Sequence, residues 1–296
     1  MSDPARSIAE PDPPVADPAP REPDPAPPVS APAPRASARA NGLDGFRVEV
    51  DAARERADVI LDRPPLNVIT MSEREQLRAT FEALDADRRV RVIVLRAQGE
   101  HFSSGGEVRG FLDASPEHLS RLAWNIGAPA RCRQPVVAAS RGYCFGVGFE
   151  LALACDFRVV SETCLYALPE QRLGQIPGSG GAARLQKMVG ITRAKDIVMR
   201  SRRLRGRQAY EWGVATECVA DGELEAATDA LVEELCGLPP LAQRTAKKLL
   251  NDTEDATLSL AIELEGQAYS RLRSSDDFRE GVEAFQAKRK PNFRGS

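Results

Sequence analysis

Residues 142–156 read GYCFGVGFELALACD. Three glycines, Gly142, Gly146 and Gly148, precede an apolar run, so the stretch predicts a tight turn that opens a helix from Gly146 to Ala154. Such a turn leaves backbone N–H groups free at the start of a helix, where they attract negative charge. One residue in the apolar run is acidic, Glu150, and a carboxylate there costs desolvation unless it has a partner or a chemical role.

Strands and helices alternate around this turn. Strands are predicted at residues 46–50 and 57–61, paired as a hairpin, and then at 90–95, 135–139 and 157–160. Thr70 and Glu73 form a capping-box pattern, and the side chains of Leu77, Phe81 and Leu84 follow it on one helix face. The alternation predicts an α/β fold with a mostly parallel sheet and right-handed crossovers.

The chain divides into three predicted regions. Residues 1–42 form a disordered Pro/Ala-rich tail, because 12 of the 22 prolines fall in the first forty residues, which hold few large apolar side chains. Residues 43–225 form the core with the site. Residues 226–296 form a helical C-terminal region, with helices predicted at 223–235, 241–250, 258–273 and 278–288; before it, a helix at 182–189 ends at Gly190.

Composition disfavours several classes of protein. The net charge of −3 gives no reason to bind nucleic acid or acidic membranes, and no apolar run approaches the roughly 20 residues that span a bilayer. His101 and His118 are the two histidines of the chain, so no multi-histidine metal site is expected. Six cysteines without a C-x-x-C pair favour the free thiols of a cytoplasmic protein.

Two further glycine loops accompany the first. Residues 101–108 read HFSSGGEV directly after a predicted strand, and residues 169–181 read PEQRLGQIPGSGG. Neither is a phosphate loop, and Gly146-x-Gly148 lacks the third glycine of a dinucleotide-binding turn. Free N–H groups from two such turns can converge into an oxyanion hole, and Glu150 and Glu170 lie in or beside these loops.

From about residue 45 to the end, the chain resembles the crotonase family, the enoyl-CoA hydratase/isomerase superfamily, and is closest in motif to enoyl-CoA hydratases. Residues 101–108 are similar to the family's F-x-A-G-x-D-[LI], and residues 142–156 to G-x-x-x-G-G-G-x-E-L-A-x-x-C-D. The stretch from Pro169 to Leu185 is similar to P-E-x-x-L-G-x-x-P-G-x-G-G-x-x-R-L. Residues 280–291 are similar to the closing E-G-x-x-A-F-x-x-K-R-x-P.

The resemblance implies a spiral of ββα units with a helical C-terminal trimerisation region, assembled as a homotrimer or a dimer of trimers. It implies an acyl-CoA substrate, whose coenzyme A belongs to the substrate, and no separate cofactor. The backbone N–H groups of Gly106 and Val147 would form the oxyanion hole. Residues expected to bind coenzyme A are Leu66, Ser104, Gly106, Glu107, Val108 and Lys288.

Glu150 and Glu170 stand where the hydratase branch of the family has its two catalytic glutamates. Adding water to a 2-enoyl thioester needs a positioned water and a proton for Cα, and two carboxyl groups can share these tasks. By analogy with the family, Glu170 supplies the Cα proton and Glu150 handles the water; the sequence itself does not fix which does which.

Three departures from the family pattern concern the acyl group. Val147 replaces the middle glycine of G-G-G, Glu107 replaces the usual aspartate, and Arg141 replaces an asparagine. Because of these departures, a substrate with a branched, cyclic or aromatic acyl group stays possible. The leading hypothesis is an enoyl-CoA hydratase. The alternatives are an enoyl-CoA isomerase or a ring-cleaving β-ketoacyl-CoA hydrolase of the same family and, more remotely, a non-catalytic oligomeric scaffold that docks through its proline-rich tail.

Overall fold

The computed structural model describes residues 42–112 and 114–296. The predicted tail, residues 1–42, lies outside the described residues apart from Gly42.

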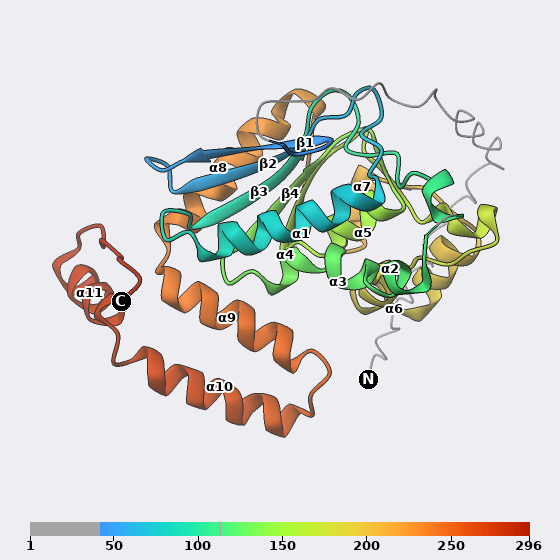
Figure 1. Cartoon of the computed structure of the whole chain (residues 1–296). Coiled ribbons are helices and arrows are strands. Elements are labelled where there is room, and N and C mark those ends of the chain that lie inside the picture. Colours follow the sequence, from blue (N-terminus) through green and yellow to red (C-terminus); the bar gives the residue numbers. More distant parts are fainter. Residues whose placement is uncertain (1–41, 113) are drawn as a thin grey trace, which may run out of the picture. The chain divides into compact units, whose positions relative to one another are not determined.

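A six-stranded sheet forms the centre of the described part (Figure 1). Its order is β1-β2-β3-β4-β6-β9, where the strands are β1 (Phe46–Asp51), β2 (Arg56–Leu61), β3 (Val92–Ala97), β4 (Val136–Ser140), β6 (Phe157–Ser161) and β9 (Glu217–Val219). β1 and β2 form the predicted antiparallel hairpin, and every later pair is parallel. The predicted hairpin and mostly parallel sheet are therefore confirmed.

A second sheet was not predicted. It has three strands, β5 (Tyr143–Phe145), β7 (Leu165–Ala167) and β8 (Leu204–Arg205), in that order. Strands of two or three residues are too short to show an alternating pattern. This small sheet matters for the site because β5 leads directly into the turn at Gly146.

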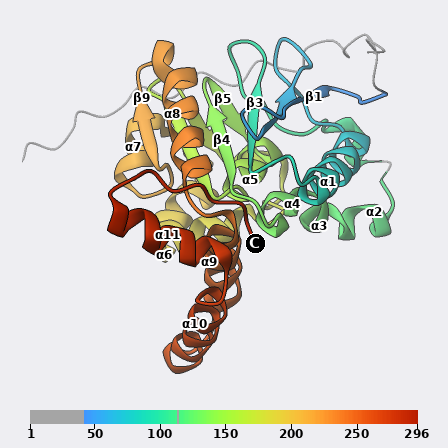
Figure 2. The same ribbon diagram turned by 90° about the vertical axis from the view of Figure 1, so that its left-hand side faces the viewer.

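The two faces of the large sheet bury different side chains. In β3, Ile93 and Leu95 join the apolar cluster that includes Leu77 and Phe81 of α1 (Met71–Ala86). Val92 and Val94 face the other way and join a cluster with α8 (Leu224–Gly237). This is the alternation expected of a strand buried on both faces, and Figure 2 shows α8 and α1 on opposite sides of the sheet.

Helix α1 begins as the sequence predicts. The side chain of Thr70 accepts from the N–H of Glu73 (3.1 Å), and the Glu73 carboxylate accepts from the N–H of Thr70 (3.4 Å). Leu77, Phe81 and Leu84 are buried along one face. The cap and the apolar face together fix how α1 lies on the sheet.

Replacing Thr70 by alanine is expected to lower the free energy of unfolding by about 1 kcal/mol, because the N–H of Glu73 loses its side-chain acceptor. Denaturant unfolding followed by circular dichroism measures the change. Thr70→Ser keeps the hydroxyl and should retain most of the stability. An alanine variant as stable as the wild type would contradict the capping role.

Several helices connect the strands. They are α2 (Pro116–Ser120), α3 (Leu122–Ile126), α4 (Ala128–Arg131), α5 (Val147–Leu153), α6 (Gly181–Met199) and α7 (Gly206–Glu211), with single turns at Arg109–Phe111, Pro169–Leu173 and Asp221–Glu223. The short helices at 116–131 were not predicted. α6 is interrupted at Gly190, whose φ of 77° confirms the predicted helix end there.

Three more helices follow α8: α9 (Pro240–Thr253), α10 (Leu258–Leu272) and α11 (Asp276–Ala287). The predicted boundary at residue 225 falls at the start of α8, which packs on the sheet, whereas α9 and α10 pack against each other (Figure 1).

The ammonium of Lys247 on α9 donates to Asp156 Oδ2 (2.6 Å) and to the carbonyls of Pro129 and Gln134 (both 2.9 Å). Among the described residues, no helix has both the length and the apolar character needed to span a membrane.

All six cysteines are free thiols, as the sequence predicts, and Cys132, Cys144, Cys155 and Cys164 are buried.

Candidate active site

Two of the glycine loops lie side by side. The N–H of Ser103 donates to the carbonyl of Tyr143 (2.8 Å), and the N–H of Phe145 donates to the carbonyl of Ser103 (2.9 Å). A Cβ built on Gly106 would lie 3.6 Å from Cγ1 of Val147. The structure therefore brings together the two residues predicted to form the oxyanion hole.

Both predicted oxyanion donors have N–H groups without a backbone acceptor among the described residues. Gly146 takes φ 50°, a conformation that favours glycine, and α5 starts at the next residue, Val147. Val147 keeps a negative φ, so its N–H points out of the first helical turn as a glycine's would. Neither this N–H nor that of Gly106 donates to a backbone carbonyl within the described part of the chain. Two free donors at adjoining residues suit the stabilisation of a developing oxyanion.

The third glycine loop holds Glu150. This side chain is 3% exposed, and its Oε1 accepts from the N–H groups of Ser179 (2.7 Å) and Gly181 (3.0 Å). A Cβ built on Gly181 would lie 2.7 Å from Cγ of Glu150, so the loop fits closely around the carboxylate. These two donors account for an acid in an apolar helix.

Glu170 lies beside the Gly146 turn. A Cβ built on Gly146 would lie 3.1 Å from Oε1 of Glu170, and Oε2 is buried without a hydrogen bond to any described residue. Burial raises the pKa of Glu170 to about 7, with a further upward contribution from the charge of Glu150. A hydrogen bond from the backbone N–H of Glu170 itself and, to a smaller extent, the charge of Arg74 oppose this rise in pKa. A carboxyl group with such a pKa can carry a proton at neutral pH and release it.

The residues predicted to bind coenzyme A divide into two groups. The carbonyl of Leu66 accepts from the N–H of Ser104 (2.8 Å), and Glu107 and Val108 are exposed just beyond the oxyanion loop. Lys288 is exposed at the end of α11, and no described hydrogen bond, ion pair or ring contact joins it to the glycine loops. Coenzyme A binding by all of these residues stays a prediction.

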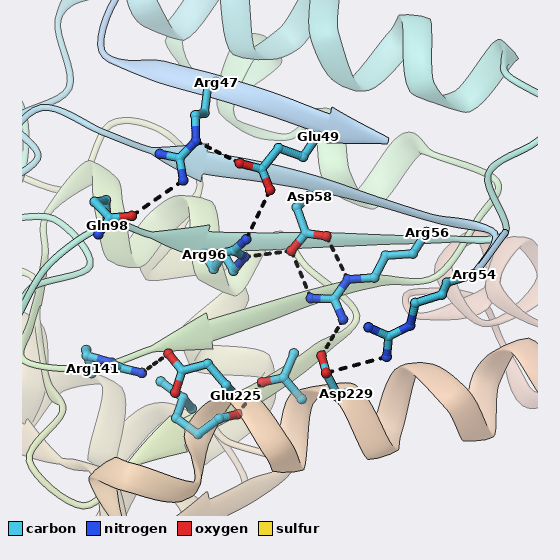
Figure 3. A network of polar contacts seen from close by, with 12 residues as sticks. Arg47, Glu49, Arg54, Arg56, Asp58, Arg96, Gln98, Arg141, Glu225 and Asp229 are labelled. Atoms are coloured by element: carbon cyan, nitrogen blue, oxygen red, sulfur yellow. Dashed lines mark hydrogen bonds and ion pairs between the residues drawn. The ribbon is translucent and has the colours of Figure 1, made fainter. Parts of the chain in front are cut away.

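Arg141, which replaces an asparagine of the family pattern, has its salt-bridge partner outside the glycine loops. Its guanidinium pairs with Glu225 of α8, at the edge of a charged network on the opposite face of the sheet (Figure 3). A hollow of about 400 Å³ lies there. The labelled arginines around it each contact a carboxylate or an amide oxygen. These contacts give the arginines of the network structural partners, and an influence of Arg141 on the acyl group stays a prediction.

Arg74 was not predicted from the sequence as a residue of the site. This arginine of α1 is 2% exposed, its guanidinium carbon lies 5.1 Å from the centre of the Phe111 ring, and its charge acts on Glu150 and Glu170. The sequence pattern could have indicated a buried arginine, because Arg74 stands three residues before Leu77 and so lies on the apolar face of the helix.

Asn67 was also missed, although it holds two loops together. Its Nδ2 donates to the carbonyls of Gln98 (3.0 Å) and His101 (2.8 Å), and its Oδ1 accepts from the N–H of Arg63 (2.8 Å). It takes φ 48°, which asparagine tolerates better than most residues.

Comparison with known proteins agrees with this geometry. The family model described as enoyl-CoA hydratase/isomerase matches residues 55–296. A probable enoyl-CoA hydratase of Rhizobium meliloti is 33% identical over 239 residues, covering 80% of this chain and 93% of that protein. A carnitinyl-CoA dehydratase of Proteus mirabilis is 30% identical over 246 residues, covering 80% and 94%.

Solved structures agree as well. The crystal structure of an enoyl-CoA hydratase from Bacillus anthracis superposes with a TM-score of 0.81 at 29% identity, covering 86% of this chain and 100% of that one. The predicted crotonase-like α/β fold with C-terminal helices is thereby confirmed, while trimerisation stays a prediction.

Proposed function

The chain belongs to the enoyl-CoA hydratase/isomerase family, and we propose that it is an enoyl-CoA hydratase, which adds water across the 2,3 double bond of an enoyl-CoA to give a 3-hydroxyacyl-CoA. The observation that carries the proposal is a pair of carboxyl groups, Glu150 and Glu170, whose charges act on each other and which lie in or beside the glycine loops that carry the two proposed N–H donors. A hydration needs both elements: donors for the thioester oxygen and two groups that handle protons.

The proposed reaction follows from these positions. The thioester oxygen lies between the N–H groups of Gly106 and Val147, which stabilise it as it gains enolate charge; one such donor is worth about 3 kcal/mol. Glu150, fixed by its two backbone donors, orients a water and accepts its proton as the hydroxyl bonds to C3. Glu170 gives its proton to Cα. Glu150 then passes the proton that it took from water to Glu170, which returns both carboxyl groups to their starting protonation states. The reaction as proposed uses no cofactor beyond the coenzyme A of the substrate.

Incubation with crotonyl-CoA tests the proposal. Loss of the enoyl-thioester absorbance together with formation of 3-hydroxybutyryl-CoA, identified by mass spectrometry, is the expected result. An isomerase would shift the double bond of a 3-enoyl-CoA without mass change, and a ring-cleaving hydrolase would open a cyclic β-ketoacyl-CoA. Turnover of either of these without hydration of any 2-enoyl-CoA would contradict the hydratase.

The pH dependence of the reaction is expected to report Glu170. Its raised pKa, about 7, means that the proton-donating form predominates below pH 7 and is lost above it. We therefore expect kcat/KM to fall about tenfold for each pH unit above this pKa. Glu73, whose pKa burial also raises to about 7, is the control: Glu73→Gln should leave the alkaline fall in place. A rate that rises through pH 7 would mean that Glu170 acts as a base.

We also propose that the chain assembles as a homotrimer or a dimer of trimers. The C-terminal helices expose large apolar side chains, Leu250, Leu258, Ile262, Tyr269 and Phe285 among them. Exposed apolar surface of this kind suits burial between copies. Sedimentation equilibrium measures the number of subunits.

A further inference from the structure

Arg74 lies directly against the oxyanion loop. A Cβ built on Gly106 would lie 2.4 Å from Nη2 of Arg74, so this position accepts the guanidinium only because glycine has no side chain. The ring of Phe111 lies close by, with its centre 5.1 Å from the guanidinium carbon, and holds the group from another side. The cation is thus placed within a few ångströms of the residue whose N–H is assigned to the thioester oxygen.

The guanidinium of Arg74 has no hydrogen bond or ion pair with any residue that the structure describes, and its Nε is closed off from solvent. Arg56, a second buried arginine, is different: it donates to both oxygens of Asp58 (2.7 and 2.8 Å) and to Asp229 (Figure 3). Buried guanidinium groups ordinarily have partners, because each N–H loses its water on burial.

Neutralising the charges of the two catalytic carboxyl groups is not a sufficient explanation for the position of Arg74. An arginine placed for that purpose would form a charge-assisted hydrogen bond with one of them. Glu150 instead takes its hydrogen bonds from the backbone of Ser179 and Gly181, and Oε2 of Glu170 has none from the described residues. The donors of Arg74 are left for a group that the described residues do not supply.

We propose that Arg74 is a specificity-determining residue that binds a carboxylate on the acyl chain of the substrate. The preferred substrates would then be enoyl-CoA thioesters of unsaturated dicarboxylic acids. This inference rests on the proposed hydratase function. A guanidinium presents donors in a fork that matches a carboxylate, and a cationic acyl group would be repelled. The phosphates of coenzyme A are a poorer match, because Arg74 is 2% exposed and phosphates are bulky and strongly hydrated.

The test compares two substrates that differ only at the end of the acyl chain: glutaconyl-CoA, which ends in a carboxylate, and 2-pentenoyl-CoA, which ends in a methyl group. The readout is the ratio of their kcat/KM values. Because both substrates use the same carboxyl groups and oxyanion donors, changes in that machinery cancel in the ratio. We expect the wild type to favour glutaconyl-CoA at least tenfold.

Two variants should abolish this preference. Arg74→Met removes the cation, and Gly106→Ala keeps the N–H but forces the flexible end of Arg74 aside. In each, the ratio is expected to fall to about one or below, and Arg74→Lys should keep part of it. Arg78→Met is the matched control, an arginine on the same helix that pairs with Glu82 at the surface, and it should keep the wild-type ratio. A wild-type ratio of one or less, or an unchanged ratio in Arg74→Met, would overturn the proposal.

Calorimetric binding of the saturated thioesters glutaryl-CoA and pentanoyl-CoA separates this inference from the proposed function. Tighter binding of glutaryl-CoA by at least tenfold, lost in Arg74→Met, would support the role of Arg74 even if no enoyl-CoA were hydrated. Hydration of 2-pentenoyl-CoA without any preference for the carboxylate in binding or turnover would keep the hydratase and refute the role of Arg74. An equal loss of affinity for both thioesters would assign Arg74 to their common part and also refute it.

Discussion

Replacing Glu170 by glutamine is expected to lower kcat for crotonyl-CoA hydration about 1,000-fold, or roughly 4 kcal/mol in activation free energy. Glutamine has nearly the same shape but carries no proton that it can release to Cα. The N–H groups of Gly106 and Val147 are unchanged, so KM should change little. Absorbance assays at saturating substrate measure kcat, and titration of the rate with crotonyl-CoA gives KM.

Two controls make this result specific. Glu234→Gln alters an exposed glutamate of α8 and should leave kcat at the wild-type value. Circular dichroism and thermal unfolding should show that the Glu170 variant is folded, since Oε2 of the carboxyl has no hydrogen bond to a described residue that the change would break. A loss of less than tenfold in a folded variant would exclude Glu170 as the proton donor.

Replacing Lys247 by methionine is expected to lower the free energy of unfolding by about 3 kcal/mol. The ammonium is almost fully buried and joins α9 to Asp156 and to two backbone carbonyls of the core. Burial raises the pKa of Asp156, and Lys247 opposes that rise; without the lysine, the carboxylate is left buried without its cation. For a chain of this size, the melting temperature should fall by about 5 °C.

The neighbouring lysine provides the matched control. Lys248 pairs with Asp252 at the surface, so Lys248→Met should change the unfolding free energy by less than about 0.5 kcal/mol. Adding Asp156→Asn to Lys247→Met removes the uncompensated charge and should recover part of the stability. Equal stability of the Lys247 and Lys248 single variants would show that the buried contacts of Lys247 contribute little.

Much of the fold could be predicted from local patterns. The strands at 46–51, 56–61 and 92–97 have apolar or β-branched runs, and the capping box at Thr70 marks the start of α1. The elements that escaped prediction depend on tertiary contacts. The helices at 116–131 have four or five residues each, and the short strands of the second sheet are defined by their pairing with one another across the chain.

Some residues of the candidate site could likewise be predicted from the sequence, and others depend on tertiary contacts. Glu150 was recognisable because a charge in an apolar helix requires an explanation, and the structure supplies it in the backbone of a loop some thirty residues later. Arg74 was overlooked because its significance lies in what it does not contact. A sequence can show a cation on the buried face of α1, but only the structure shows that Gly106 lies beside it and that no carboxylate of the described residues is bonded to it.

Because the glycine loops pair through their backbones, substitutions of side chains around them have a different effect from changes in the loop backbone itself. The proposed oxyanion donors belong to the main chain, and their positions are set by backbone hydrogen bonds such as that from Phe145 to Ser103. Side chains can therefore be exchanged without moving the donors, as valine stands at position 147 where the related motif has glycine. Acyl-group preference could then diverge through residues such as Arg74 while the step common to all substrates is preserved. An engineer who wishes to change the substrate should accordingly vary the side chains that surround these loops and leave the loops themselves intact.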